Sequence, residues 1–352
     1  MQKRSYVWIL ELKVLFLLSI VAVILAACGG DDIATTDKEA TEQSTDKLSI
    51  YTTVYPLQYF AERIGGEYVD VSSIYPPGAN EHTFEPTQKD MMTLADADMF
   101  FYIGLGLEGF VEKAKNTLAN EHVKLVATAD YVSEDHLHIS TGHVHAEGEE
   151  DDHGHEAESH EEHEHEEEAS NVLIDHTGHE HDSHVWLSPV ISEDLAAVIK
   201  DELVAAMPEQ EALFTENYEA LITELKELHA NFEAMAAQTT QKTFFVSHAA
   251  FGYIAGHYGF TQVPVAGLNS QSEPSQKELT KIVDLAKKED VQYIFFEQNV
   301  SSNLTDVIRN EVGADSLILH NLSVLTADDI KNGETYFTLM EKNMEALKTA
   351  LQ

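Results

Sequence analysis

The sequence predicts an α/β protein of two Rossmann-like lobes with parallel sheets, joined by a long rigid helix and separated by a cleft. Two regions, one before residue 130 and one after residue 242, alternate short β-branched and aromatic runs with helical segments. Between them lies a long stretch in which apolar residues recur every three or four positions. Alternating strands and helices are typical of parallel sheets covered by helices, and such sheets bind ligands outside the carboxyl ends of their strands. We therefore expect the binding site in the cleft.

Residues 1–28 form a predicted lipoprotein signal peptide. A basic segment precedes an apolar run at 14–27, and roughly fourteen apolar residues fall short of the ~20 that span a bilayer. A transmembrane anchor is the alternative. The run ends in Leu-Ala-Ala-Cys, which resembles the lipobox of bacterial lipoproteins, and Cys28 is the only cysteine in the chain. We expect lipidation of Cys28, a flexible tether at 29–46, and a location on the extracellular face of a bacterial membrane.

The amino-terminal lobe is predicted at residues 47–187. Its strands are expected where β-branched and aromatic residues cluster, and the segments between them have the apolar spacing of helices. The expected strands are residues 48–53, 69–75, 99–103 and 124–129.

Residues 135–182 of this lobe are predicted to be a disordered loop, because a segment dominated by histidines and carboxylates has too few apolar residues to bury a core. Imidazoles with pKa values near 6.5 are mostly neutral at pH 7 and can coordinate metal ions, so we interpret the loop as a low-affinity metal collector. A plain spacer is the alternative. The expected accessory ligands are His153, His155, His160, His163, His165, His179 and His181.

Residues 188–240 are predicted to connect the lobes as one short and one very long helix, interrupted at Pro208. The carboxy-terminal lobe follows at 241–352. Its expected strands are a run that begins at residue 243 and ends directly before His248, and residues 261–267, 291–297 and 315–321. Its expected helices are residues 275–290, 301–313 and 336–351.

The formal net charge of −41, from 62 acidic and 21 basic residues, repels phosphates and anionic head groups. Nucleic acid is therefore excluded as a partner, and cations are favoured.

Three histidines stand where loops are expected to follow strands or precede a helix: His82, His184 and His248. Neutral imidazole is a favoured zinc ligand. A single histidine at a strand end is more often a hydrogen-bonded structural residue, so each position alone leaves both interpretations open. His320 is ambiguous because it lies late in an expected strand.

The flanks "YPPGANEHTFEPTQKD", "SHVWLSP" and "FFVSHAAFGYIAGHYGFTQVPVAGLNSQSEPS" resemble, in order and spacing, the zinc-binding solute receptors of ABC importers, the ZnuA/AdcA group. The resemblance extends over residues 48–352. It implies a metal site between the two lobes with His82, His184 and His248 as ligands. It further implies a monomeric protein, not an enzyme, that captures Zn²⁺ outside the cell and passes it to a permease driven by a cytoplasmic ATPase.

The third histidine favours zinc, because receptors that resemble manganese carriers have a carboxylate at the position of His248 and oxygen ligands suit manganese. The fourth ligand is open. Many similar Gram-positive receptors have a glutamate where this chain has Ser323, and a serine hydroxyl is a poor zinc ligand. Water or Glu81 is expected in its place, ahead of His320.

Other functions are a manganese receptor, a surface metal buffer or adhesin, and a metallohydrolase. The incomplete ligand set motivates the hydrolase, but the chain has no HExxH motif and no carboxylate clearly placed as a general base.

Overall fold

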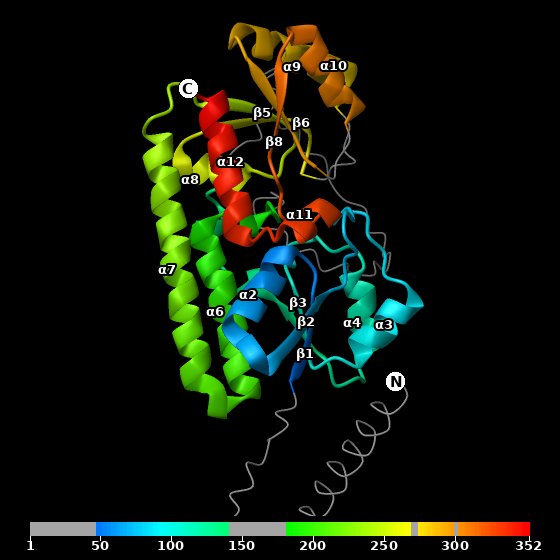
Figure 1. Ribbon diagram of the computed structural model, residues 1–352. Helices are drawn as coiled ribbons and strands as arrows, with labels where there is room; N and C mark the ends of the chain where they lie inside the picture. The colour runs from blue at the N-terminus through cyan, green and yellow to red at the C-terminus, as the bar shows by residue number, and fades with distance from the viewer. Residues whose placement is uncertain (1–46, 141–180, 269–273, 299–301) are drawn as a thin grey trace, which may run out of the picture. The chain divides into compact units, whose positions relative to one another are not determined.

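The computed structural model describes most of the chain after the predicted tether (Figure 1), as residues 47–140, 181–268, 274–298 and 302–352. The predicted signal peptide, Cys28, the tether and the loop histidines from His153 to His179 lie outside the described residues. Within the described ranges, no helix has the length and apolarity needed to cross a membrane.

The first sheet has four parallel strands in the order β2-β1-β3-β4. Ile50 of β1 pairs with Val71 on one side and Met99 on the other. The strands are β1 (Leu48–Thr52), β2 (Val69–Ser73), β3 (Met99–Tyr102) and β4 (Lys124–Ala127). The connecting segments contain α2 (Tyr55–Gly65), η1 (Gly66–Tyr68), α3 (Gln88–Ala95), α4 (Val111–Leu118) and η2 (Thr128–Tyr131).

Local sequence signals explain where these helices begin. Thr87 caps α3 by accepting from the Asp90 backbone N–H, and the Asp90 side chain accepts from the Thr87 N–H in return. Proline stands in the first turn of α2, where no intrahelical donor is lost. The cap of α3 fixes the end of the loop that follows β2, and this loop contains Glu81 and His82.

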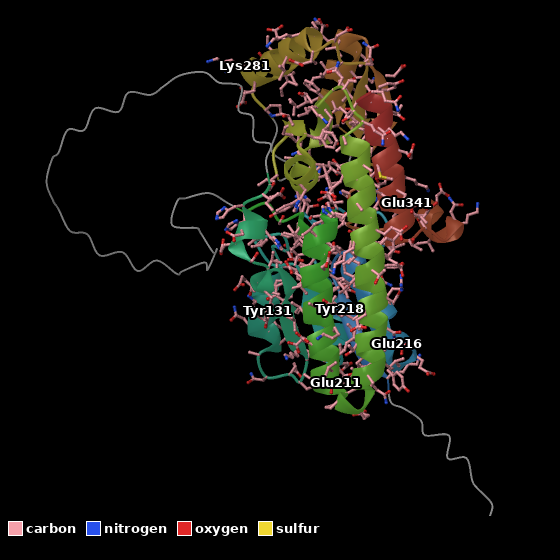
Figure 2. The ribbon with its side chains drawn as sticks, turned by 90° about the vertical axis from the view of Figure 1, so that its left-hand side faces the viewer. Tyr131, Glu211, Glu216, Tyr218, Lys281 and Glu341 are labelled. Atoms are coloured by element: carbon pink, nitrogen blue, oxygen red, sulfur yellow. The ribbon has the colours of Figure 1, made fainter. Side chains whose placement is uncertain are left out.

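Two helices connect the sheets, α6 (Pro189–Ala206) and α7 (Glu211–Ala236), with η4 (Pro208–Gln210) between them. The shorter of the two expected helices is α6, with 18 residues, because its proline stands at the first helical position and the next breaker is Pro208. Glu211 and Glu216 lie on the exposed side of α7, whereas Tyr218 lies beneath Lys200 of α6 (Figure 2). Since α7 contacts α2, α6, α8 (Gly252–Tyr258) and α12 (Tyr336–Ala350), one helix packs against elements of both lobes.

The second sheet repeats the first arrangement, with four parallel strands in the order β6-β5-β7-β8. The strands are β5 (Thr243–His248), β6 (Thr261–Ala266), β7 (Tyr293–Phe296) and β8 (Asp315–Ile318). The helices are α8 (Gly252–Tyr258), α9 (Gln276–Lys288), α10 (Asn303–Val312), α11 (Ala327–Asn332) and α12 (Tyr336–Ala350). The predicted fold class, two α/β lobes with parallel sheets, is confirmed.

The main hydrophobic core is continuous from Ile50 in the first sheet through Trp186 and α7 to Phe295 in the second. A smaller cluster around Phe245 and Ile294 lies beneath α9 and α10. All of Asp46–Gln352 forms one compact unit, so the lobe boundaries that we expected near residues 187 and 240 stay predictions.

The ends of the predicted disordered loop are ordered. Ser133 caps α5 (Glu134–Leu137), Leu137 is buried, and the Ser140 hydroxyl donates to the Asp182 carboxylate at 2.7 Å. The structure therefore describes residues 135–140 and 181–182, which the expected bounds of 135–182 had placed in the loop. Burial of Leu137 and the hydrogen bond between Ser140 and Asp182 fix these two short segments. After the loop, η3 (Val185–Leu187) leads into α6.

Candidate metal centre

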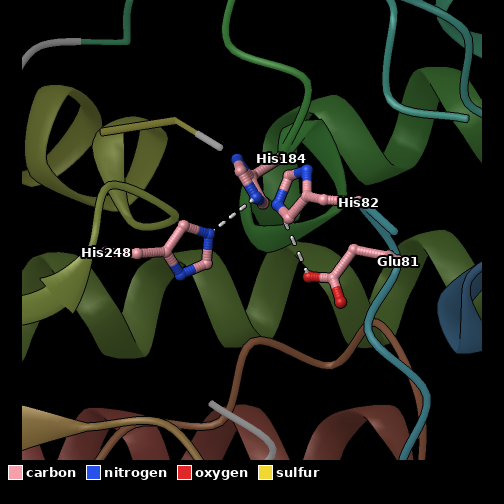
Figure 3. A group of neighbouring side chains, drawn as sticks. All are labelled: Glu81, His82, His184 and His248. Atoms are coloured by element: carbon pink, nitrogen blue, oxygen red, sulfur yellow. Dashed lines mark hydrogen bonds and ion pairs between the residues drawn. The ribbon is translucent and has the colours of Figure 1, made fainter. Parts of the chain in front are cut away.

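Four side chains from three distant segments converge in the structure: Glu81, His82, His184 and His248 (Figure 3). One ligand atom of each lies within 4.8 Å of those of the other three. Glu81 and His82 come from the loop after β2, His184 directly precedes η3, and His248 ends β5. The structure therefore brings together the three predicted histidines and Glu81, one of the two candidates ranked first for the fourth position.

The spacing of the ligand atoms suits a tetrahedral metal ion. The Nε2 atoms of His184 and His248 are 3.2 Å apart, and about 3.3 Å separates two nitrogens that bind one zinc ion at ~2.0 Å. The ring centroids of the three histidines are separated by 5.1–5.5 Å. The Glu81 Oε1 atom lies 3.9 Å from His82 Nε2. All four groups could contact one ion after small side-chain movements.

Buried carboxylates fix two of the imidazoles. His184 Nδ1 lies 2.8 Å from Asp182 Oδ1, and His248 Nδ1 lies 2.6 Å from Glu297 Oε1. A carboxylate accepts the Nδ1 proton, so the Nε2 lone pair of each ring is directed to the centre of the site. This is the tautomer that a metal ligand needs.

His82 provides the third nitrogen, and its orientation comes from a local turn. The Asn80 side chain accepts from the His82 backbone N–H at 3.0 Å. His82 Nε2 is buried and has no hydrogen-bond partner among the described residues. Burial, together with the neighbouring His184 and His248, lowers the pKa of His82 to about 3, so this imidazole is neutral at pH 7. An unpaired buried acceptor directed at two other imidazoles indicates a cation ligand.

The remaining titratable groups respond to burial and to each other. Burial raises the pKa of Glu81. Burial alone would lower the pKa of His248, but the adjacent Glu297 carboxylate outweighs it and the net pKa of His248 is raised. Burial opposes ionisation of Glu297 as well, yet His248 and its hydrogen bonds hold the Glu297 pKa below the usual value. A bound cation therefore replaces protons that the metal-free site holds.

The structure does not bring His320 or Ser323 into this group. His320 Nε2 lies 3.1 Å from Asp329, and its Nδ1 accepts from the Leu322 N–H at 2.9 Å, so both ring nitrogens have partners. The Ser323 hydroxyl donates to Asn321 Oδ1 at 2.9 Å. Of the accessory histidines, only His181 is described; its Nε2 lies 3.7 Å from Glu134 Oε2.

Sequence reasoning missed three residues that contact the ligands: Asp182, Glu297 and Asn321. Two of them had a signal. Asp182 lies two residues before His184 and was assigned to the loop, and Glu297 is a carboxylate at the end of an apolar strand. Asn321 had none, because the two carboxylates that it bonds, Glu81 and Glu297, lie 240 and 24 residues away in the chain.

A family model described as "Zinc-uptake complex component A periplasmic" (ZnuA) matches residues 50–350. The chain belongs to this family. The family resemblance stated from the sequence is therefore confirmed.

The zinc-binding lipoprotein AdcA of Streptococcus pneumoniae strain R6 is 34% identical over 343 residues, which cover 95% of this chain but only 60% of AdcA. The high-affinity zinc uptake system protein ZnuA of Bacillus subtilis is 32% identical over 96% of this chain and 97% of its own. The Zn(II)-bound ZnuA-like domain of S. pneumoniae AdcA superposes with a TM-score of 0.65 at 32% identity, covering 87% of this chain and 99% of the domain.

Proposed function

We propose that the protein is an extracellular receptor that binds Zn²⁺ tightly and delivers it to an ABC-type importer. One observation carries the proposal: His184 and His248, both buried, and His82, whose side chain is 7% exposed, direct their Nε2 atoms at one point, and carboxylates fix His184 and His248 through Nδ1. The relatives named above for zinc binding and zinc uptake support the choice of metal. A family defined by an uptake component also supports a binding protein rather than an enzyme.

Zinc is preferred over manganese because of the ligand chemistry. Three imidazoles and one carboxylate form a nitrogen-rich, borderline-soft set, whereas manganese favours carboxylate, carbonyl and water oxygens. His82 stays neutral well below pH 7, so a proton does not compete for its nitrogen. A manganese receptor is the weaker alternative.

We assign Glu81 as the fourth ligand. Its side chain is 1% exposed and lies among the three rings, and an isolated buried carboxylate requires a cation or hydrogen-bond donors. The alternatives are less well supported: both nitrogens of His320 are engaged elsewhere, and the Ser323 hydroxyl is directed at Asn321. A water ligand stays possible only if Glu81 turns away from the metal.

The histidine-rich loop is proposed as a low-affinity collector that supplies this site. At its ordered ends, Glu134 Oε2 lies 3.8 Å from His138 Nε2 and 3.7 Å from His181 Nε2, which are groups that attract a cation. Asp182 bonds both Ser140, at one end of the loop, and His184, in the metal site. Zinc gathered by the loop would thus arrive next to a ligand of the tight site.

The remaining parts of the proposal concern location and partners. Lipidation of Cys28 would hold the protein at the outer face of the membrane, with residues 29–46 as the tether. The partners would be the membrane permease and its ATPase, and the receptor would act as a monomer.

Competition between the full chain and a zinc chelator, which reports only tight sites, tests the proposal. We expect one tight zinc ion per chain, lost in His248→Ala and kept in His122→Ala, a matched change at an exposed histidine. Manganese should displace the zinc poorly. Equal zinc binding by wild type and His248→Ala would refute the cleft site and leave a metal buffer.

A further inference from the structure

Asn321 lies between two carboxylates of the metal centre that come from different lobes. Its Nδ2 donates to Glu81 Oε1 at 3.0 Å and to Glu297 Oε2 at 3.0 Å. Glu81 belongs to the loop after β2, whereas Glu297 directly follows β7. Asn321 itself is 1% exposed, so no solvent competes for these bonds. One side-chain amide thus links the candidate fourth ligand to the carboxylate that fixes His248.

Ser323 determines which way this amide faces. The Asn321 Oδ1 accepts from the Ser323 backbone N–H at 3.1 Å and from the Ser323 hydroxyl at 2.9 Å. Rotating the amide by half a turn would put its oxygen against two carboxylate oxygens and its NH₂ against two donors. Only the observed orientation satisfies all of these buried groups.

Hydrogen bonds and burial fix the backbone from Asn321 to Ser323. Its carbonyl accepts from Trp186 Nε1 at 2.7 Å, and the Ser323 carbonyl accepts from the Tyr55 N–H at 2.9 Å. Leu322, between them, is fully buried and has a φ of 58°, a left-handed conformation that a non-glycine residue keeps only where its surroundings impose it. The amide is therefore presented from a fixed support.

We propose that Asn321, oriented by Ser323, is the positioning residue that holds the Glu81 carboxylate at the metal as its fourth ligand. A neutral amide with two N–H groups can serve two neighbouring carboxylates at once, which reduces their repulsion without adding a competing cation. A carboxylate oxygen that accepts one hydrogen bond keeps a further lone pair for a metal. The inference rests on the proposed zinc site and extends it to the control of its fourth position.

A double-mutant cycle in the full chain tests this, with zinc affinity measured by chelator competition and coordination by the visible absorption of bound Co²⁺. Asn321→Leu should weaken zinc binding about 10–100-fold and change the cobalt spectrum as Glu81→Gln does. When Glu81→Gln is already present, adding Asn321→Leu should change the affinity by less than about threefold. Equal effects in both backgrounds would overturn the proposal, because Asn321 would then act through Glu297 or through the fold.

Two further variants separate positioning from general damage. Asn343→Ala disturbs the same segment, since Asn343 bonds the backbone of His320, but Asn343 contacts neither carboxylate. It should leave the cobalt spectrum unchanged. Ser323→Ala removes only the hydroxyl that orients Asn321. It should lower the zinc affinity less than Asn321→Leu does and change the cobalt spectrum in the same way. Ser323→Thr, which keeps a hydroxyl, should have the affinity and spectrum of the wild type.

If Asn321→Leu does not fold, Ser323→Ala decides the question, and a wild-type affinity and spectrum in that variant would overturn the proposal. Failure of this inference differs from failure of the receptor function. If His248→Ala loses the tight zinc site but the Asn321 and Ser323 variants bind zinc as tightly as the wild type, the proposed receptor function stands. Only the positioning role of Asn321 is then refuted.

Discussion

Replacing Glu297 by glutamine should weaken zinc binding although Glu297 is not expected to touch the metal. Its buried carboxylate accepts from the Ser247 hydroxyl at 2.7 Å, from His248 Nδ1 at 2.6 Å and from Asn321 Nδ2 at 3.0 Å. Glutamine offers one acceptor oxygen and one NH₂ group. At least one of the buried donors therefore meets another donor or loses its partner.

The magnitude follows from these bonds. One unsatisfied buried group costs about 1–3 kcal/mol of folding stability. If the His248 ring instead changes tautomer to accept from the glutamine NH₂, its Nε2 carries a proton and cannot bind metal. Loss of such an orienting partner typically lowers metal affinity 10–100-fold, which is about 1.4–2.7 kcal/mol.

Chelator competition gives the zinc affinity and thermal unfolding gives the stability of the Glu297→Gln chain. Glu311→Gln, which removes a carboxylate at an exposed ion pair with Lys287, is the matched control and should leave zinc affinity unchanged. A Glu297→Gln chain that binds zinc as tightly as wild type would refute the argument that this carboxylate selects the tautomer of His248.

Two other changes have defined outcomes. Zinc affinity should fall as the pH is lowered through the raised pKa of His248, by up to about tenfold per pH unit. The reason is that zinc must displace the His248 proton, which the Glu297 carboxylate stabilises. Protonation of His82, with a pKa of about 3, should not change the affinity above pH 5. Affinities measured between pH 8 and 5.5 check this, and a flat profile contradicts it. Gly256→Ala should destabilise the fold by about 1–3 kcal/mol in urea unfolding, because the new Cβ would lie 1.8 Å from the Ile139 carbonyl oxygen, whereas Gly109→Ala, with open space, should be nearly neutral. Equal urea unfolding midpoints for the two variants would show that the Ile139 backbone can move to accommodate the new Cβ without loss of stability.

The sequence was sufficient for the strands and for the lobes, because each strand is a compact β-branched or aromatic run and the two sets are separated by helical periodicity. The break between α6 and α7 was predicted from Pro208, because proline cannot continue a helix, whereas Pro189 begins α6 at the first helical position, where proline is tolerated. The short helix α5 was missed because its order depends on Leu137 entering a core built from other segments. Composition alone cannot report such a tertiary contact.

The metal centre was also predicted only in part from the sequence. His82, His184 and His248 were candidates because each stands at a strand end or helix start, and the family resemblance made them the expected ligands. The sequence ranked water or Glu81 ahead of His320, but it could not predict the contacts of either side chain: Asn321, 240 residues from Glu81, bonds the Glu81 carboxylate, and Asp329 lies within hydrogen-bond distance of His320 Nε2. Ser323, a departure from the pattern of similar receptors, gains a role only once its hydroxyl is seen to orient Asn321.

The histidines of the centre are far apart along the chain; His184 and His248 alone are separated by 64 residues. A zinc ion held by all three would act as a reversible cross-link that an unfolded chain lacks. By mass action, free zinc at 100 times the dissociation constant adds about 2.7 kcal/mol to the free energy of unfolding. The zinc-loaded protein would then resist proteolysis better than the empty one, and the amount of intact protein would itself follow the supply of zinc.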